Sequence, residues 1–263
     1  MDWFFATNDS ALAFPLYADL AKVAVHTALA HTRLRPYLLY DGKENAFSKW
    51  MHDHGVEVIN LESSYLNDFA EIPKPVDDAS RSALRGMFLK LELPQLGARL
   101  GLNDHVLYTD CDVMFCADVV DELSAIECRY FAVAGEFDPN NYHKINAGVM
   151  WMNLAGLREV EPAFRESVRT YLRGDPQGGS WDQGAFIRFF GGENFRWNKL
   201  RPELNWKPYW GANDQAKIIH FHGPKPYQRP FLDHIPQLHH LTVGAYEELS
   251  REWEGLLAVA NAS

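Results

Sequence analysis

Cysteine and basic residues are both scarce in this sequence. The 263 residues include three cysteines, Cys111, Cys116 and Cys128, whose number and spacing give no disulfide framework. A small, odd set of cysteines is typical of a reducing compartment. Lys and Arg number 25 against 35 Asp and Glu, so the formal net charge is −10. This balance argues against a general surface for nucleic acid or an anionic membrane, because both bind basic faces.

Long apolar runs are also missing. No stretch approaches the roughly 18 apolar residues of a membrane span, and the opening MDWFFATNDS lacks the basic and apolar regions of a signal peptide. Hydrophobic residues make up 47% of the chain and charged residues 23%, which suits a globular protein with a sizeable core. We therefore expect a soluble, cytoplasmic protein with a single domain over residues 1–263, since α/β domains of about 200–250 residues are common.

Hydrophobic periodicity predicts strands and helices in alternation. Strands are expected at 3–7, 36–40, 56–61, 105–109, 130–134, 147–153 and 217–221. Helices are expected at 17–31, 44–54, 81–100 with a bend at Pro94, 155–173, 182–190 and 245–260. Residues 62–80 and 191–215 are expected to be irregular. The βαβαβ beginning implies a parallel sheet with helices on its faces, so the sequence predicts an α/β fold.

Two carboxylates follow the strand expected at 105–109. Asp110 and Asp112 are two residues apart, so on an extended chain both side chains point to one side, just past the carboxyl end of that strand. Ligands bind at this end of open α/β sheets. A divalent cation would remove the repulsion between the two charges, because carboxylates ligate Mg²⁺ or Mn²⁺, usually together with substrate phosphates. The pair therefore predicts a metal site beside a phosphorylated ligand, with a solvated turn as the alternative.

A haloacid-dehalogenase-like phosphatase is a rival interpretation of the same pair, because its nucleophile motif is also Asp-x-Asp after an apolar strand. That family usually has Thr or Val two residues after the second Asp, where this chain has Met114. Its motif also normally lies on an early strand, whereas three expected strands precede this one. Both differences disfavour the phosphatase.

Three further stretches place polar residues beside apolar elements. They are KINAGVMWMNL (144–154), WDQGAFIRFF (181–190) and IIHFHGPKPY (218–227). In the first, Asn146 precedes Gly148, where the backbone can approach a ligand closely. In the second, Asp182 stands at the start of a helix, where a simple N-cap is the commonest role. The third has two histidines on one strand face, a pattern that is more often incidental than ligating. Each signal alone is weak.

Taken together, the motifs resemble glycosyltransferase family 8, the family of glycogenin and of bacterial lipopolysaccharide galactosyltransferases. The resemblance covers about residues 3–227 and is strongest in YTDCDV, NAGVMWMNL, DQG and HFHGPKP, which leaves 228–263 as a C-terminal helical tail. It implies the GT-A fold, a single nucleotide-binding α/β domain with a mixed, mostly parallel sheet and helices on both faces. It further implies a UDP-sugar donor, Mn²⁺ with Mg²⁺ as the alternative, and retention of anomeric configuration during hexose transfer to a carbohydrate or protein acceptor.

The resemblance also implies roles for single residues. Asp110, Asp112 and His220 match the metal ligands, and the His-x-x-Gly spacing to Gly223 selects His220 over His222. A nitrogen ligand beside carboxylates suits Mn²⁺. The other matches are Lys225 for the donor diphosphate, Asp182 and Gln183 nearest the reacting carbon, and Thr7, Asn8, Tyr17, Lys90, Asn146, Ala147, Gly148 and Gly223 for further donor contacts.

The turn after the histidines departs from the family pattern. Lys225 comes five residues after His220 instead of six, and Tyr227 stands where the family often has Trp. Gln183 is a poor nucleophile, so the resemblance favours front-face attack by the acceptor over a covalent intermediate. A sugar-nucleotide-binding protein without transfer activity would keep the same metal and diphosphate residues, and it stays the second hypothesis.

Overall fold

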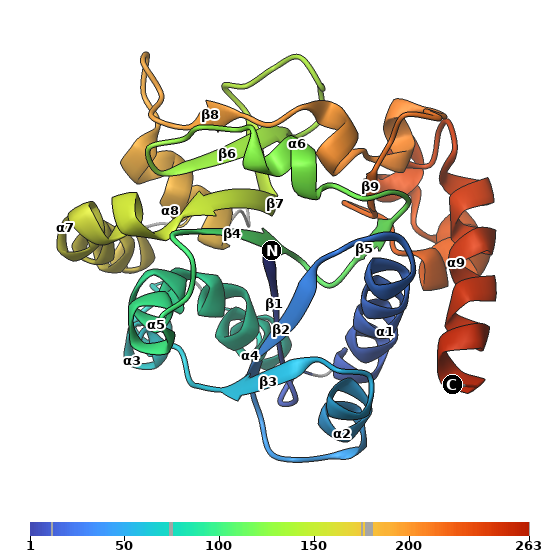
Figure 1. Cartoon of the computed structure of the whole chain (residues 1–263), viewed down its shortest axis with the longest axis horizontal. Helices are drawn as coiled ribbons and strands as arrows, with labels where there is room; N and C mark the ends of the chain where they lie inside the picture. Colours follow the sequence, from blue (N-terminus) through green and yellow to red (C-terminus); the bar gives the residue numbers. More distant parts are fainter. Residues whose placement is uncertain (12, 74–75, 175, 177–180, 263) are drawn as a thin grey trace.

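A seven-stranded sheet forms the centre of the molecule in the computed structural model, which describes residues 1–11, 13–73, 76–174, 176 and 181–262. Its strands are β1 (Asp2–Asn8), β2 (Arg35–Asp41), β3 (Glu57–Asn60), β4 (His105–Thr109), β6 (Phe131–Gly135), β7 (Ile145–Asn153) and β8 (Asn198–Lys199). Their order is β3-β2-β1-β4-β7-β6-β8 (Figure 1). β7 is antiparallel to β4 and β6, and the remaining neighbours pair in parallel. The expected mixed, mostly parallel sheet is confirmed.

Helices cover both faces of this sheet (Figure 1). The α-helices are α1 (Phe14–His31), α2 (Ala46–Asp53), α3 (Leu66–Ala70), α4 (Asp78–Met87), α5 (Leu93–Leu100), α6 (Val120–Ser124), α7 (Leu154–Arg173), α8 (Trp181–Phe190) and α9 (Tyr246–Ala262). The 3-10 helices are η1 (Phe88–Glu92), η3 (Pro202–Asn205), η4 (Pro208–Trp210), η5 (Pro226–His234) and η6 (Pro236–Leu241).

The sequence of β1 is a continuous apolar run and does not alternate between apolar and polar residues, because both faces of this strand are buried. Trp3 and Phe5 pack in one buried cluster with α1, α2 and α9, whereas Phe4 packs in the other with α4, α5, α7 and α8. All three side chains are fully buried. A parallel strand covered on both faces buries every side chain, and a continuous apolar run follows from that burial.

The predicted elements lie close to the observed ones, with four corrections. Residues 62–80 are not wholly irregular, since they contain α3 and the start of α4. The helix expected over 81–100 is divided into α4, η1 and α5, and Pro94 lies in the first turn of α5, where its missing N–H breaks no helical hydrogen bond. Strand β5 (Val113–Phe115), which pairs with β9 (Ile218–His220), was not predicted from the sequence. The segment 191–215, expected to be irregular, contains β8, η3 and η4.

The carboxyl ends of β1 and β4 and the amino end of β7 meet at one edge of the sheet. There the backbone N–H of Asp110 donates to the carbonyl of Gly148 at 2.7 Å, which fixes the residue after β4 against the start of β7. The antiparallel pair of β5 and β9 places Val113 opposite His220. Two short strands thus bring a histidine from late in the chain next to Asp112.

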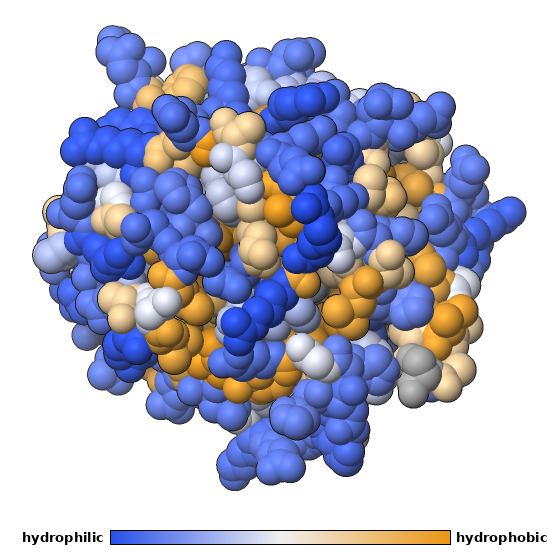
Figure 2. All heavy atoms as spheres, in the orientation of Figure 1, coloured by the Kyte–Doolittle hydropathy of each residue, from blue (hydrophilic) through white to orange (hydrophobic). Residues whose placement is uncertain are grey.

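The C-terminal helix α9 packs on α1 (Figure 1). Its Trp253 is buried in the cluster that contains α1, and Lys22 Nζ of α1 donates to Asn261 Oδ1 of α9 at 2.8 Å. Hydrophilic residues cover most of the face seen in Figure 2, with hydrophobic residues exposed between them. Among the described residues, none of the helices combines the length and apolarity that crossing a membrane requires.

Candidate active site

A cavity of about 450 Å³ lies at the edge where β1, β4 and β7 meet. The residues predicted from the sequence that line it are Thr7, Asn8, Tyr17, Asp110, Asp112, Asn146, Ala147, Gly148, Asp182, Gln183, His220, Gly223 and Lys225. Lys90 is 1% exposed, and its ammonium bonds to Asp110 from the protein side. The structure therefore brings the predicted residues together around one space.

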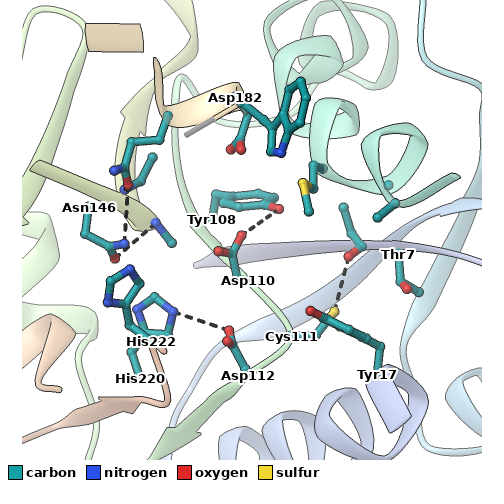
Figure 3. A pocket seen from close by; sticks show the side chains of 18 of the residues that line it. Thr7, Tyr17, Tyr108, Asp110, Cys111, Asp112, Asn146, Asp182, His220 and His222 are labelled. Atoms are coloured by element: carbon teal, nitrogen blue, oxygen red, sulfur yellow. Dashed lines mark hydrogen bonds and ion pairs between the residues drawn. The ribbon is translucent and has the colours of Figure 1, made fainter. Parts of the chain in front are cut away.

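Three of these side chains form a group with the composition of a metal site. One ligand atom each from Asp110, Asp112 and His220 lies within 4.8 Å of the other two. Asp110 and Asp112 lie in the link between β4 and β5, and His220 ends β9 (Figure 3). His222, two residues further, is outside this group. Two carboxylates and an imidazole are a donor set that suits a divalent transition metal such as Mn²⁺.

A chain of side-chain amides fixes the ring of His220. The backbone N–H of Gly148 donates to Asn146 Oδ1, which also accepts from Asn205 Nδ2 at 3.1 Å. The Oδ1 of Asn205 is therefore left to face His220 Nδ1, at 2.9 Å. Because an amide oxygen can only accept, the ring proton belongs on Nδ1. This leaves the lone pair of Nε2 directed into the cavity.

The atom opposite that lone pair is also an acceptor. Asp112 Oδ1 lies 3.3 Å from His220 Nε2, is fully buried, and lacks a hydrogen-bond partner among the described residues. The contact is close enough for an ion pair but misses hydrogen-bond geometry, which agrees with an unprotonated Nε2. A buried carboxylate oxygen without a partner costs free energy. A cation held between Nε2 and Oδ1 would satisfy both atoms, so the residues present fit a metal ion.

Lys225 brings a positive charge to the carboxylate of Asp112. Its Nζ lies 2.5 Å from Asp112 Oδ2 and donates to the carbonyl of Phe221 at 2.8 Å. Burial of Asp112 disfavours its charged form, but the ammonium of Lys225 outweighs this effect and holds the pKa of Asp112 well below its ordinary value. Asp112 is therefore ionised at any physiological pH.

Gly148 leaves the room that this arrangement needs. A Cβ built on Gly148 would lie 2.2 Å from His220 Cε1 and 2.8 Å from Asp110 Oδ2. Both distances are far below van der Waals contact, so any larger residue would displace a candidate ligand. The candidate metal site therefore requires glycine at position 148 of the NAG motif, because a side chain there would overlap the ligands.

Lys90 joins the candidate metal site to Asp182. Its Nζ lies 2.7 Å from Asp182 Oδ2 and 3.2 Å from Asp110 Oδ1, and it donates to the carbonyl of Ala147 at 3.0 Å. Burial alone would lower the pKa of Lys90, but the two carboxylates outweigh it and raise the pKa. Asp182 is the second residue of α8, and its side chain contacts Lys90. The simple N-cap interpretation of Asp182 does not describe this contact.

Gln183 is oriented by the backbone of β7. Its Oε1 accepts from the N–H of Ala147 at 2.9 Å, so its Nε2 must donate, and it does so to Glu136 Oε1 at 3.0 Å. Glu136 lies 3.6 Å from His222 Nε2, and the other ring nitrogen of His222 bonds to Tyr209 OH at 2.8 Å. Burial, together with the nearby charge of Lys225, lowers the pKa of His222 far below its usual range. His222 is thus neutral and hydrogen-bonded beside the candidate metal site.

The opposite end of the cavity is formed by β1, α1 and α4. Thr7 and Asn8 end β1, and Asn8 is held by its donation to the carbonyl of Ser82 at 3.0 Å. Tyr17 lies across from them, and burial followed by Asp112 and Asp110 raises its pKa well above the ordinary value. Figure 3 shows Thr7 and Tyr17 on one side of the carboxylates, and Asn146 and the histidines on the other.

Two residues of this site were missed by sequence reasoning, Glu136 and Asn205. Glu136 is the second residue after the strand expected at 130–134, so the argument applied to Asp110 could have found it. Asn205 gave no signal, because it lies in a segment that looked irregular, and its contact with His220 depends on the fold.

Comparisons with known proteins identify the fold. Neither a protein-family model nor a curated protein sequence matches the chain. The structure of galactosyltransferase LgtC in complex with donor and acceptor sugar analogues matches with a TM-score of 0.68 and 17% identity, over 98% of this chain and 96% of that one. An active-site mutant of LgtC matches with a TM-score of 0.69 and 18% identity, with the same coverage. The chain has the GT-A glycosyltransferase fold.

A third neighbour with the GT-A fold is the glycosyltransferase GlyE of Streptococcus pneumoniae. It matches with a TM-score of 0.63 and 17% identity, over 98% of this chain and 63% of that one. The expected GT-A fold is therefore confirmed, and the candidate metal site lies within it. At these identities the neighbours show the fold alone.

Proposed function

We propose that this protein is a retaining glycosyltransferase of the family-8 type, acting as one domain over residues 1–263. It moves a hexose from a UDP-sugar to an acceptor hydroxyl. The observation that carries the proposal is the apposition of His220 Nε2 and Asp112 Oδ1, which lacks a hydrogen-bond partner among the described residues, with Asp110 beside them in a cavity of a GT-A fold. The glycosyltransferases with similar structures support the same class of reaction.

The cavity offers a distinct environment for each part of such a donor. Thr7, Asn8 and Tyr17 would bind the uridine at the β1 and α1 end. Asp110, Asp112 and His220 would hold Mn²⁺, which would offset the charge of the diphosphate when bound. Lys225 brings a compact positive charge to the same place, where negative charge grows as the glycosidic bond breaks.

The hexose would lie at the far side of the metal site from the uridine. Asn146, Ala147 and Gly148 form that wall, and the oriented amide of Gln183 and the carboxylate of Asp182 lie next to it. Gln183 already bonds through both ends of its amide, so it can position the sugar but is a poor nucleophile. This arrangement favours attack of the acceptor hydroxyl from the face that the diphosphate leaves, with retention of configuration.

Ligand binding tests the proposal directly. Thermal unfolding is measured with a panel of nucleotide sugars, each with Mn²⁺, Mg²⁺ or EDTA, because a ligand of the native state stabilises it by RT ln(1 + [L]/Kd). We expect UDP-sugars with Mn²⁺ to raise the Tm more than other nucleotide sugars do, and EDTA to remove the effect. Product formation then separates a transferase from a protein that only binds nucleotide sugars. Equal response to all nucleotides, or none, would contradict the proposal.

A further inference from the structure

The C-terminal helix α9 contacts the turn that carries Lys225. The hydroxyl of Tyr246, the first residue of α9, donates to the backbone carbonyl of Lys225 at 2.8 Å. Tyr246 is 2% exposed, and its ring belongs to the buried cluster that also contains Trp253 and the core face of α1. Tyr246 is not among the described residues that line the cavity. Packing therefore fixes its hydroxyl, which meets the candidate site only through the backbone of Lys225.

The backbone of Lys225 is bonded at both of its polar groups. Its N–H donates to Oε1 of Gln228 at 2.7 Å. Its carbonyl accepts from the N–H of Gln228 at 2.8 Å and from the hydroxyl of Tyr246. Gln228 lies in the first turn of η5, so its two bonds are local. The bond from Tyr246 spans 21 residues of sequence and ties this turn to a separate helix.

The C-terminal segment holds the same turn at its start and at its end. Gly223 has a φ of +90°, and a Cβ built there would lie 2.6 Å from Leu241 Cδ1, so the chain passes close to η6. Nη2 of Arg229 donates to the two carboxylate oxygens of Glu254 at 2.9 and 3.0 Å, and Nη1 donates to Glu247 at 3.2 Å. Exposed ion pairs contribute little alone, but these lie on either side of the bond to the carbonyl of Lys225 in α9.

The proposed role of Lys225 requires an exact position for its ammonium. Nζ lies 2.5 Å from Asp112 Oδ2 and donates to the carbonyl of Phe221 at 2.8 Å. A lysine has a long, flexible stem and loses much conformational freedom when its end is held. A fixed backbone reduces what remains to be ordered. A shift of about 1 Å in a group that meets the reacting atoms can cost about 100-fold in rate.

We propose that Tyr246 is a positioning residue for Lys225, so that the C-terminal helix takes part in placing the ammonium beside the diphosphate. The inference rests on the proposed function, in which Lys225 stabilises the leaving group. Helix α9 lies beyond the stretch of about residues 3–227 that resembles family 8, so the resemblance implies no role for it. A tyrosine hydroxyl bonded to a carbonyl can also serve packing alone, so the test must separate position from stability.

Trace acetylation of lysine amines on the full chain, without any ligand, tests the position of Lys225 itself. Mass spectrometry gives the labelling rate of each lysine. The side chain of Lys225 is 16% exposed and paired with Asp112, so it should label slowly in the wild type. Tyr246→Phe removes only the hydroxyl, and we expect it to speed labelling of Lys225 at least about threefold, as the loss of one ordinary hydrogen bond predicts. Labelling of Lys217 should not change.

Steady-state kinetics with a UDP-sugar test whether this position matters for transfer. We expect Tyr246→Phe to lower kcat about three- to tenfold and to leave KM nearly unchanged. In a Lys225→Ala background the same substitution should have no further effect, because the group that it positions is gone. The matched control is Tyr142→Phe, which also removes a hydroxyl that donates to a carbonyl, that of Leu200 at 3.1 Å. It should behave like the wild type in both assays.

Unchanged labelling of Lys225 in Tyr246→Phe would overturn the inference. Equal losses of kcat from Tyr246→Phe with and without Lys225 would also overturn it, because the effect would then bypass the lysine. If Lys225 labelling responds as expected but the wild type transfers no sugar from any UDP-sugar, the proposed function fails and the positioning contact stands. The Tm of each variant shows that it is folded.

Discussion

The side-chain oxygen of Asn205 lies 2.9 Å from Nδ1 of His220, and this contact determines which nitrogen of the histidine faces the cavity. The orientation of Asn205 is itself set by its donation to Asn146, whose oxygen accepts from a backbone N–H. A backbone donor in β7 thus controls the tautomer of a candidate ligand three hydrogen bonds away. Metal-binding histidines commonly have such a partner on the other nitrogen.

Replacement of Asn205 should therefore weaken metal binding without touching a ligand. Asn205→Ala removes the acceptor for Nδ1–H, and we expect Mn²⁺ affinity in the presence of UDP to fall about 10–100-fold. Electron paramagnetic resonance of free Mn²⁺ measures the affinity. Asn198→Ala, at an exposed position of β8, is the control and should bind like the wild type. Unchanged affinity in Asn205→Ala would mean that the amide chain is only a packing feature.

Gly148→Ala should abolish metal binding by steric displacement. The added methyl would stand 2.2 Å from His220 Cε1 and 2.8 Å from Asp110 Oδ2, so at least one of them must move. Gly148 has a negative φ, so alanine adds no backbone strain there. We expect the loss of Mn²⁺-dependent stabilisation by UDP in thermal unfolding.

The control for this variant is Gly255→Ala, because a Cβ at Gly255 in α9 meets no atom within 4 Å. Alanine in a helix stabilises by up to about 1 kcal/mol relative to glycine, so this variant should keep its response to UDP and Mn²⁺. A full response in Gly148→Ala as well would show that the two candidate ligands do not hold the metal.

Lys225→Ala should lower kcat more than it raises KM. The charge of Lys225, 2.5 Å from Asp112 Oδ2, meets negative charge that grows in the transition state, so the loss falls on kcat by about 100-fold. Steady-state kinetics over a range of UDP-sugar concentrations measures both constants. Lys217→Ala is the control, since Lys217 pairs with Glu122 at 2.8 Å and does not line the cavity. An effect confined to KM would assign Lys225 to donor binding alone.

The sequence predicted the parts of the site whose chemistry is visible in single residues. Asp110 and Asp112 are conspicuous because two like charges at the end of a buried strand repel each other, and the family spacing to Gly223 indicated which histidine to choose. The structure places His220, and not His222, with the two carboxylates. The GT-A fold was implied by the family resemblance that these motifs carry, and the structure confirms it.

Contacts between distant segments could not be predicted in this way. Asn205 reaches His220 because the next residue, Trp206, pairs with Ile219 of β9, and nothing in the segment 191–215 signalled that pairing. Lys90 was predicted as a donor contact, yet its ammonium lies beneath the carboxylates, because η1 buries it among Phe88, Leu89 and Leu91. A lysine within an apolar stretch signals a buried partner, but the partner's identity requires the fold.

Asp182→Ser should separate a catalytic role from a helix cap. Serine caps a helix about as well as aspartate, but it cannot hold the ammonium of Lys90, which lies 2.7 Å from Asp182 Oδ2. We expect transfer activity to fall at least about 100-fold while UDP and Mn²⁺ still bind, because the loss concerns the transition state. Proton NMR of the first-formed product gives the stereochemistry in the wild type. Wild-type activity in Asp182→Ser would leave Asp182 without a role in transfer.

The last prediction concerns stability and pH, and it rests on Lys207. This residue is 0% exposed, and its Nζ donates to the carbonyl of Gly135 and lies 4.3 Å from the centroid of the Trp210 ring. Burial lowers its pKa well below the ordinary value, and Glu136 offsets only part of that effect. In the unfolded chain a lysine is protonated up to about pH 10.4. The unfolded state therefore binds more protons between the two pKa values.

Stability should consequently rise with pH in that interval, by up to about 1.4 kcal/mol per pH unit from this one group. Lys207→Met removes the titration. The stability of the variant relative to the wild type should therefore be highest at low pH and should fall as pH rises. The hydrogen bond to Gly135 is lost at every pH. This loss lowers the free energy of unfolding of the variant by about 1–3 kcal/mol at each pH and does not change how it depends on pH. Urea unfolding at about pH 6, 7.5 and 9 measures the slope, and Lys43→Met, at an exposed position, is the control. Parallel pH profiles for wild type and Lys207→Met would mean that Lys207 is charged in the folded protein.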